Sequence, residues 1–391
     1  MYAVSHNIWK ITLIRTTRSF MLIIPIIVLF FQENGLTLQE IFILQSLFSL
    51  TLVVFEIPTG YLSDRFGRKN SIVIGCVLGS VGYAAYSLSH GFWGFLIAET
   101  VLGFGASFIS GSDSAMPYDS LNELDRVSEH KKLEGRTMSF CMLSEGVAGI
   151  LGSILAIVSL RFPLYCETAI VSLTIPTAFL LVEPKREALE RKMSPINDMI
   201  RLVRYALHDH AEIKWLSLYS SVVGASTLTM VWFIQPYLKQ AGLPIMYFGA
   251  IWAALLFVGS YFSWHAHVIE RKLGKTLSLV ALIIMPALGY LVLGSSGSLL
   301  AGTGITLFFV TRGIHNPVLA DYINALVDSE IRATVLSAKN LAGRILFAIV
   351  GPLVGWVTDG YSISTALFLC CALFLILGSI TLIGLSHAQR I

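Results

Sequence analysis

Residues 60–69 read Gly-Tyr-Leu-Ser-Asp-Arg-Phe-Gly-Arg-Lys, a short polar stretch between two long apolar runs. Gly60 closes the first run, where the lack of a side chain lets two helices approach closely. Gly67 permits a tight turn that a larger residue would resist. Asp64 is able to pair with an arginine or to accept hydrogen bonds from a helix N-terminus. Three basic residues hold the stretch at an aqueous surface: Arg65, Arg68 and Lys69.

The composition around this stretch is that of a protein in lipid. Of the 391 residues, 55% are hydrophobic and 13% are charged, whereas soluble domains carry about 25% charged residues. The mean hydropathy is +0.74. A net charge of +3 gives no reason to expect a nucleic-acid partner. The 5 cysteines show neither zinc-site spacing nor a disulfide framework, so we expect no metal and no cofactor.

Twelve apolar runs are long enough to cross a bilayer, which takes about 20 helical residues. Backbone polar groups in lipid must find partners within the segment, so each run is predicted to be a helix. We therefore expect an all-α membrane protein with twelve transmembrane helices. The predicted spans are 10–32, 40–62, 70–89, 93–115, 137–160, 163–182, 213–236, 244–268, 276–294, 299–324, 333–357 and 362–386.

Basic residues fix the expected orientation. One set of loops and ends holds 20 of the 27 Lys and Arg residues, and the opposite set holds only Arg161 and Lys239. Cytoplasmic loops are the ones enriched in Lys and Arg. Both termini are therefore predicted to be cytoplasmic, as an even number of spans requires.

A polar stretch divides the chain into two sets of six spans. We expect an N-terminal bundle over 1–182, a linker over 183–212 and a C-terminal bundle over 213–391. Apolar residues in the linker recur at helical spacing, which favours an amphipathic helix on the membrane surface, with a soluble linker helix as the alternative. Glu-Gly-Arg at 134–136 and Glu-Ile-Arg at 330–332 stand at equivalent places in the two halves. Such repeated halves are typical of transporters.

The stretch 60–69 resembles the hallmark loop of the major facilitator superfamily, Gly-x-Leu-(Ala/Ser)-Asp-Arg-x-Gly-Arg-(Lys/Arg). The resemblance implies two pseudo-symmetric six-helix bundles. It also implies that Gly60, Asp64 and the loop's other motif residues form a gating latch, with Asp64 as its central group. The alternative is that the loop only sets topology. The equivalent loop of the second half keeps its charge but loses the spacing, so we assign it no role.

Ionisable residues inside a membrane are costly and mark functional sites. The proton-coupling candidates are Glu56, Glu99, Asp113 and Glu145. Glu99 and Asp113 are predicted to share one face of the fourth span. Many proton-coupled members of the superfamily have an arginine where Glu99 stands, so their arginine-based coupling cannot be carried over. The glycine spacing around Glu145 resembles the superfamily's antiporter motif but lacks its proline. For Glu99 and Asp113 the alternative is pairing with arginines, and for Glu56 it is structural support of the 60–69 loop.

Basic, aromatic and amide side chains inside the predicted spans are candidates for substrate binding. They are Arg15, Arg18, Trp232, Gln235, Arg312, His315 and Asn316. Arg15 and Arg18 either pair with acids of the fourth span, such as Asp113, or hold an anionic group of the substrate. Tryptophan and tyrosine also mark membrane interfaces without any substrate, and this is the interpretation we favour for Tyr237 at the outer end of the seventh span.

These observations favour a secondary transporter over other classes of protein. We expect it to be a monomer of the bacterial inner membrane that couples the movement of a small solute to protons, with export as the favoured direction. Uptake of an anionic nutrient or a siderophore-like metal chelate, and a non-transporting receptor on the same scaffold, are the alternatives. No nucleotide-binding loop, nucleophile motif or acid–base pair indicates an enzyme.

Overall fold

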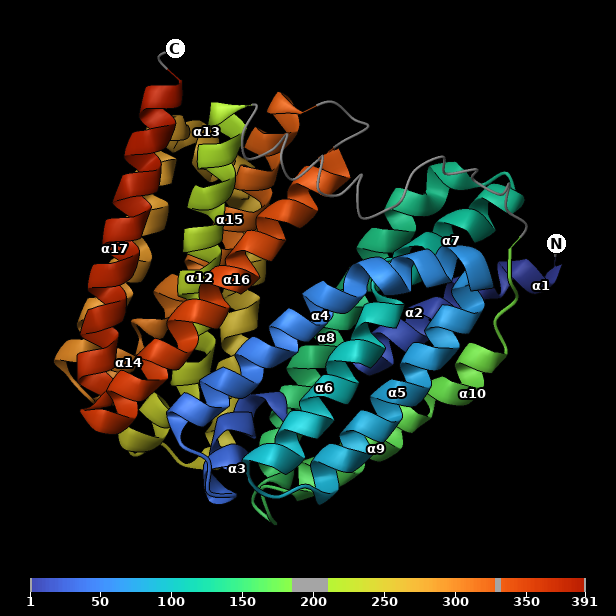
Figure 1. The fold of residues 1–391 in the computed structure, drawn as a ribbon, viewed down its shortest axis with the longest axis horizontal. Coiled ribbons are helices and arrows are strands. Elements are labelled where there is room, and N and C mark those ends of the chain that lie inside the picture. Colours follow the sequence, from blue (N-terminus) through green and yellow to red (C-terminus); the bar gives the residue numbers. More distant parts are fainter. Residues whose placement is uncertain (1, 185–209, 328–331, 390–391) are drawn as a thin grey trace. The chain divides into compact units, whose positions relative to one another are not determined.

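A computed structural model describes residues 2–184, 210–327 and 332–389, and its regular elements over these ranges are all helices (Figure 1). The predicted all-α membrane fold is confirmed. Within the described residues, nine helices are long and apolar enough to cross a membrane. One of them, Ile245–Ser295, covers two predicted spans, and the shorter apolar helix Ile24–Glu33 lies in the predicted first span. The linker helix expected in 183–212 falls mostly outside the described residues.

The chain forms two compact units. Unit 1 comprises Met1–Leu36, Leu47–Lys192 and Ile245–Ala253, and unit 2 comprises Thr37–Ser46, Met193–Pro244 and Ala254–Ile391. The units differ from the expected halves at two helix ends, 37–46 and 245–253.

The described helices of the first half begin with α1 (Tyr2–Ser5), α2 (Asn7–Arg18), η1 (Ile24–Ile26), α3 (Ile27–Glu33), α4 (Leu38–Phe66), α5 (Arg68–Leu88) and α6 (Gly91–Ile109). They continue with α7 (Ser112–Glu123), η2 (Val127–Glu129), α8 (His130–Leu155), α9 (Phe162–Ser172) and α10 (Thr174–Phe179). The second half contains α12 (Ala211–Gln240), η4 (Ile245–Tyr247), α13 (Phe248–Ser295), α14 (Leu299–Gly302), α15 (Ile305–Leu326), α16 (Arg332–Gly360) and α17 (Ile363–Ala388).

Glycines let the helices of unit 1 pack closely. A Cβ added to Gly75 of α5 would overlap the Ile109 side chain of α6, and one added to Gly105 would lie 3.1 Å from the backbone nitrogen of Gly79. Close helix contacts through small residues are the usual way of packing spans in lipid. The close approach predicted at Gly60 is not found, because a Cβ there meets no atom of the described residues within 4 Å.

Among the described spans of unit 1, the first and the fourth are interrupted near predicted site residues. The first span breaks between the end of α2 at Arg18 and the start of η1 at Ile24, and the fourth breaks where Gly111 takes a φ of 78°. The prediction of one continuous stripe from Glu99 to Asp113 was therefore wrong. The two residues belong to α6 and α7, on opposite sides of a turn that only glycine adopts easily.

A second kind of glycine turn occurs at equivalent loops of the two halves of the chain. Gly67 links α4 to α5 with a φ of 100°, and Gly274 interrupts α13 with a φ of 76°. Gly274 lies in the loop of the second half that is equivalent to the 60–69 loop. The backbone of the repeat is thus preserved where its side-chain spacing is not.

Arg161 joins the ends of three helices within unit 1. Its guanidinium donates to the carbonyl oxygens of Ser87 and Ser89 at 2.6 and 3.0 Å, and also to the side-chain oxygen of Asn34. The same group lies 5.1 Å from the centre of the Phe30 ring. A single cation therefore ties the start of α9 to the ends of α3 and α5.

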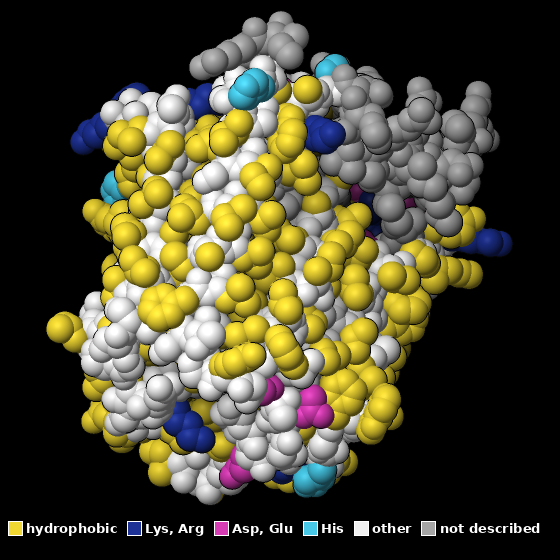
Figure 2. Space-filling model, turned by 60° about the vertical axis from the view of Figure 1, so that its left-hand side comes forward, with side chains coloured by type: hydrophobic (Ala, Val, Ile, Leu, Met, Phe, Trp, Pro, Cys, Tyr) yellow, Lys and Arg dark blue, Asp and Glu magenta, His cyan; other side chains and the backbone are white. Residues whose placement is uncertain are grey.

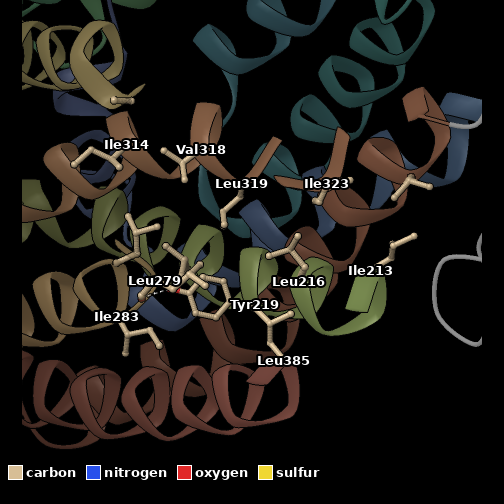
Figure 3. Close-up of a cluster of buried hydrophobic side chains, with 14 of the residues drawn as sticks. Ile213, Leu216, Tyr219, Leu279, Ile283, Ile314, Val318, Leu319, Ile323 and Leu385 are labelled. Carbon is tan, nitrogen blue, oxygen red and sulfur yellow. Dashed lines mark hydrogen bonds between the residues drawn. The ribbon is translucent and has the colours of Figure 1, made fainter. Parts of the chain in front are cut away.

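The core of unit 2 is a layer of aliphatic side chains around Tyr219 (Figure 3). Tyr219 is fully buried, and its hydroxyl donates to the carbonyl oxygen of Leu279. Leu216 of α12, Ile283 of α13 and Leu385 of α17 pack around it. Burying the Tyr219 hydroxyl costs little because its hydrogen bond is made.

The outer surface suits a hydrocarbon environment. Hydrophobic side chains cover the middle of one face, and charged side chains gather near its upper and lower edges (Figure 2). Among the exposed residues are Trp264 and Leu300, which are 80% and 81% exposed. Apolar exposure on this scale marks a surface that meets a membrane or a partner.

We expect Gly152→Ala to destabilise the protein, because a Cβ at Gly152 would overlap the carbonyl oxygen of Leu22 in the break of the first span. Overpacking of this kind costs about 1–3 kcal/mol. Gly135→Ala is the matched control, since it lies in the same helix and its Cβ would meet nothing within 4 Å. Thermal melting of the two purified variants measures the difference. Equal melting temperatures would contradict the close packing at Gly152.

Candidate functional site

The 60–69 loop is held by a carboxylate from the end of the sixth span. The Glu183 oxygens accept hydrogen bonds from the backbone nitrogens of Arg68 and Lys69, at 2.9 and 2.8 Å. These amides belong to the first turn of α5, where backbone donors lack helical partners and an anion is favoured. Sequence reasoning missed Glu183 because its partner is the backbone of a distant residue.

The loop's side chains divide into an inner and an outer group. Arg68 forms an ion pair with Asp119 of α7, with 2.6 Å between Nε and Oδ2. Asp64 and Arg65 are exposed, and Lys69 is half-buried. Arg68 therefore fastens α5 to α7, while Asp64 is presented outward.

A second charged cluster joins three helices of unit 1. One Arg15 nitrogen lies 2.8 and 2.9 Å from the two carboxylate oxygens of Glu134 in α8. Asp113 of α7 is more distant, at 3.9 Å from Arg15 Nε. Arg15 and Asp113 are thus brought together as ion-pair neighbours, with Glu134 as the closer and unpredicted partner.

The other predicted residues of unit 1 lie apart from this ion pair. Arg18 is half-buried and forms no ion pair within 4 Å among the described residues. Glu56 is exposed and accepts a hydrogen bond from Ser110 at 3.2 Å. Glu145 is half-buried in α8. The four predicted carboxylates therefore do not form one cluster.

Glu99 belongs to α6, and its side chain, which contacts α5, is only 4% exposed. It accepts a hydrogen bond from the Tyr86 hydroxyl at 2.9 Å. The Tyr86 ring packs against Phe30 and Phe95, with centroid distances of 6.3 and 5.4 Å. This carboxylate is enclosed by aromatic rings rather than presented to water.

Glu167 of α9 is fully buried, and it was not among the predicted site residues. One carboxylate oxygen accepts a hydrogen bond from the backbone nitrogen of Ile23 at 3.0 Å. That nitrogen lies in the break of the first span. The sequence signal was present, since Glu167 stands inside the predicted span 163–182, but it lies near that span's outer end.

The polar residues of unit 2 gather on α12, α15 and α16. His315 is 4% exposed, and its Nε2 lies 3.0 Å from both the hydroxyl and the carbonyl oxygen of Ser220. Lys339 is 8% exposed and has no acidic partner among the described residues. Lys339 and Arg312 both lie close enough to His315 to act on it electrostatically. Sequence reasoning placed Lys339 in the eleventh span but did not include it in the site.

The remaining substrate candidates differ in exposure. Arg312 and Asn316 are exposed on α15, whereas Gln235 of α12 is 3% exposed. Trp232 is half-buried, and its indole nitrogen has no hydrogen-bond partner in the described part of the chain. The preference for Tyr237 as an interface residue was wrong. It is 1% exposed and its hydroxyl donates to the carbonyl oxygen of Ser296 at 2.6 Å.

Most of the chain matches a known protein family. A family profile described as Major Facilitator Superfamily matches residues 12–352. The chain belongs to the Major Facilitator Superfamily. The resemblance of the 60–69 loop is thereby confirmed, and the protein is a multi-pass membrane transporter.

Several relatives within the superfamily are bacterial. The chain is 24% identical to "Inner membrane transport protein YajR" of Escherichia coli over 85% of this chain and 73% of that protein. It is 22% identical to the MFS-type transporter YxaM of Bacillus subtilis over 90% and 89%. It is also 24% identical to "Quinolone resistance protein NorA" of Staphylococcus aureus, over only 44% and 45%.

Solved structures agree with the superfamily fold. The nucleoside transporter NupG superposes with a TM-score of 0.78 at 13% identity, over 98% of this chain and 99% of that one. A D-xylose-proton symporter gives 0.71 at 13% identity, over 97% and 96%. Likeness at such low identity concerns the fold and not the cargo.

Removing the Glu183 carboxylate should weaken the start of α5. Glu183→Ala leaves the Arg68 and Lys69 amides without their acceptor, and the loss of a helix cap costs about 1 kcal/mol. Glu183→Gln keeps an acceptor oxygen, so its stability should lie between that of the natural protein and that of Glu183→Ala. Chemical denaturation of the purified protein measures the change. The control is Glu33→Ala, because Glu33 is exposed at the end of α3. A cap is excluded if both alanine variants behave alike.

Proposed function

We propose that this superfamily member is a secondary active transporter that moves a small solute across the bacterial cytoplasmic membrane by alternating access. Its relatives come from bacteria, and one is described as an inner-membrane protein. The 20 to 2 distribution of basic residues supports cytoplasmic termini. Transporters with repeated halves work by moving one bundle against the other around a central site.

We further propose coupling to protons, and the observation that carries it is the sharing of Arg15 between two carboxylates. Glu134 takes the short contact at 2.8 Å, and Asp113 is left at 3.9 Å. Asp113 is therefore the carboxylate that loses least when it is neutralised by a proton. Neutralising it also leaves the neighbouring cations, including half-buried Arg18, with less negative charge near them. Proton binding would therefore change the electrostatics around Arg15 and Arg18.

Export is the favoured direction. The support is the similarity to a quinolone resistance protein, which extends over about half of each chain. Glu56, Glu99 and Glu145 stay secondary proton-coupling candidates. Trp232 and Gln235 are proposed as contacts for the apolar and amide parts of a substrate.

Uptake of an anionic solute is the second candidate, and a specific observation favours it. Lys339 is buried without a described acidic partner, next to His315 and in electrostatic reach of that residue together with Arg312. A buried cation needs an anion or strong hydrogen bonds to offset its desolvation. A carboxylate or phosphate group on the solute would supply that charge, with Asn316 as a further hydrogen-bonding partner.

The 60–69 loop is proposed to act as the gating latch. Gly67 supplies the turn, Arg68 and Lys69 are anchored through their backbone to Glu183, and Asp64 is exposed at the surface of the loop. Because the turn is fixed from the inside, movement of the latch would depend on Asp64 rather than on rearrangement of the loop.

Transport into vesicles separates these directions. Purified protein in proteoliposomes is tested with ethidium as a cationic probe and carboxyfluorescein as an anionic probe, with and without an imposed pH gradient. We expect gradient-driven movement of ethidium, reduced at least tenfold in Asp113→Asn because the titrating group is gone. Movement of carboxyfluorescein, reduced in Lys339→Ala but not in Asp125→Asn, would favour the anionic solute instead. Probe movement that ignores the pH gradient would overturn proton coupling.

Neutralising the latch should slow transport without weakening binding. Asp64→Asn is expected to reduce the rate of flux severalfold, while the concentration of probe at half-maximal rate stays within about twofold, because Asp64 is proposed to act on gating and not on the substrate. Asp125→Asn is the control, since Asp125 is an exposed acid of another loop and loses the same charge. Equal flux in the two variants would remove the gating role.

A further inference from the structure

The break in the first span exposes a need for hydrogen bonding inside unit 1. Between Arg18 and Ile24 the helix is interrupted, so backbone nitrogens there lack the partners that a continuous helix provides. In lipid such groups must be satisfied by the protein itself. The carboxylate of Glu167 does so, by accepting from Ile23 at 3.0 Å and by facing the amide of Leu22.

The second oxygen of this carboxylate is left over. Glu167 is 0% exposed, and its Oε1 has no hydrogen-bond partner among the described residues. The Tyr83 hydroxyl lies against the carboxylate, but not in the geometry of a hydrogen bond to Oε1. A buried polar atom without a partner is costly, and a buried negative charge without a cation is more so.

The charged and titratable groups around Glu167 do not neutralise it. Tyr83 and Tyr86 are the titratable groups of α5 on this side. Glu99 of α6 acts electrostatically on both tyrosines. From α2 comes Arg18, which acts on Tyr83 but forms no ion pair with Glu167. The surroundings therefore favour the neutral acid at Glu167.

We propose that Glu167 is a proton-binding site of the transporter, and that its proton controls how firmly the break in the first span is held. Binding adds one proton to Oε1 and breaks no other covalent bond. The added proton removes the negative charge from a carboxylate that is 0% exposed. This inference rests on the proposed proton coupling and adds a second proton site, distinct from Asp113, within unit 1.

The consequence for the first span follows from hydrogen-bond strength. A carboxylate accepts a backbone N–H roughly twice as strongly as a neutral group does. Protonated Glu167 therefore holds Leu22 and Ile23 less tightly. The break directly follows Arg18 and is packed against Gly152 of α8, so a change there reaches the helix that carries Arg15 and Arg18.

Infrared spectroscopy tests the proton site without any transported ligand. Difference spectra of the purified full-length protein are recorded across a pH series, and the carbonyl stretch of buried carboxylic acids is followed. We expect a titrating band in the natural protein that is lost in Glu167→Gln and shifted in Glu167→Asp. Glu33→Gln, which removes an exposed acid, should keep the band. A band that survives unchanged in a folded Glu167→Gln variant would overturn the proposal.

Hydrogen exchange tests the link to the break. Exchange at the Leu22 and Ile23 amides, corrected for the intrinsic effect of pH, should be severalfold faster at low pH in the natural protein and independent of pH in Glu167→Gln. A purely structural Glu167 would give the same corrected rate at every pH and would contradict the control of the break. Proton-driven transport with no band at Glu167 would leave the proposed function standing and remove this inference. A Glu167 band with gradient-independent transport would do the reverse.

Discussion

A helix that stops within a membrane leaves backbone amides and carbonyls that only the protein can satisfy. In unit 1 that constraint falls on the break of the first span, and two neighbouring spans meet it. Glu167 accepts from Ile23, and the lack of a side chain at Gly152 lets α8 approach the Leu22 carbonyl. The positions of α2 and α3, and hence of Arg15 and Arg18, depend on this small polar contact in an apolar bundle.

The spans and the family could be read from the sequence because they rest on properties that single residues carry. Length and apolarity define a span in lipid, and the glycines and charges of the 60–69 loop keep their spacing. The breaks could not be read in the same way. The residues from Ser19 to Ile23 are nearly as apolar as their neighbours, and their departure from the helix is supported by Glu167, which lies 144 residues away in sequence from Ile23.

The candidate site was read only in part for a related reason. Arg15 and Asp113 were expected to meet, and they do lie within 3.9 Å. Glu134, the closer partner, was seen only as one element of a repeated triplet. Glu167 and Lys339 draw their interest from burial and from the lack of described ionic partners. Burial of this kind depends on tertiary packing, which a single sequence does not display.

The two halves share their backbone plan and differ in their polar contents. Gly67 and Gly274 make the same turn, but the buried ionisable residues differ, because unit 1 holds Glu99 and Glu167 whereas unit 2 holds Lys339 and His315. The proposed proton sites therefore lie in unit 1, and the proposed contact with an anionic solute lies in unit 2.

The contacts of Arg161 bear on how the chain is inserted into the membrane. In the proposed orientation it is one of only two basic loop residues on the outer side, so its charge must cross the bilayer during synthesis. Its partners, Asn34, Ser87 and Ser89, all precede it in the chain. The oxygens that accept hydrogen bonds from Arg161 are therefore synthesised before Arg161 itself. Its charge meets partners from segments that precede it in the chain.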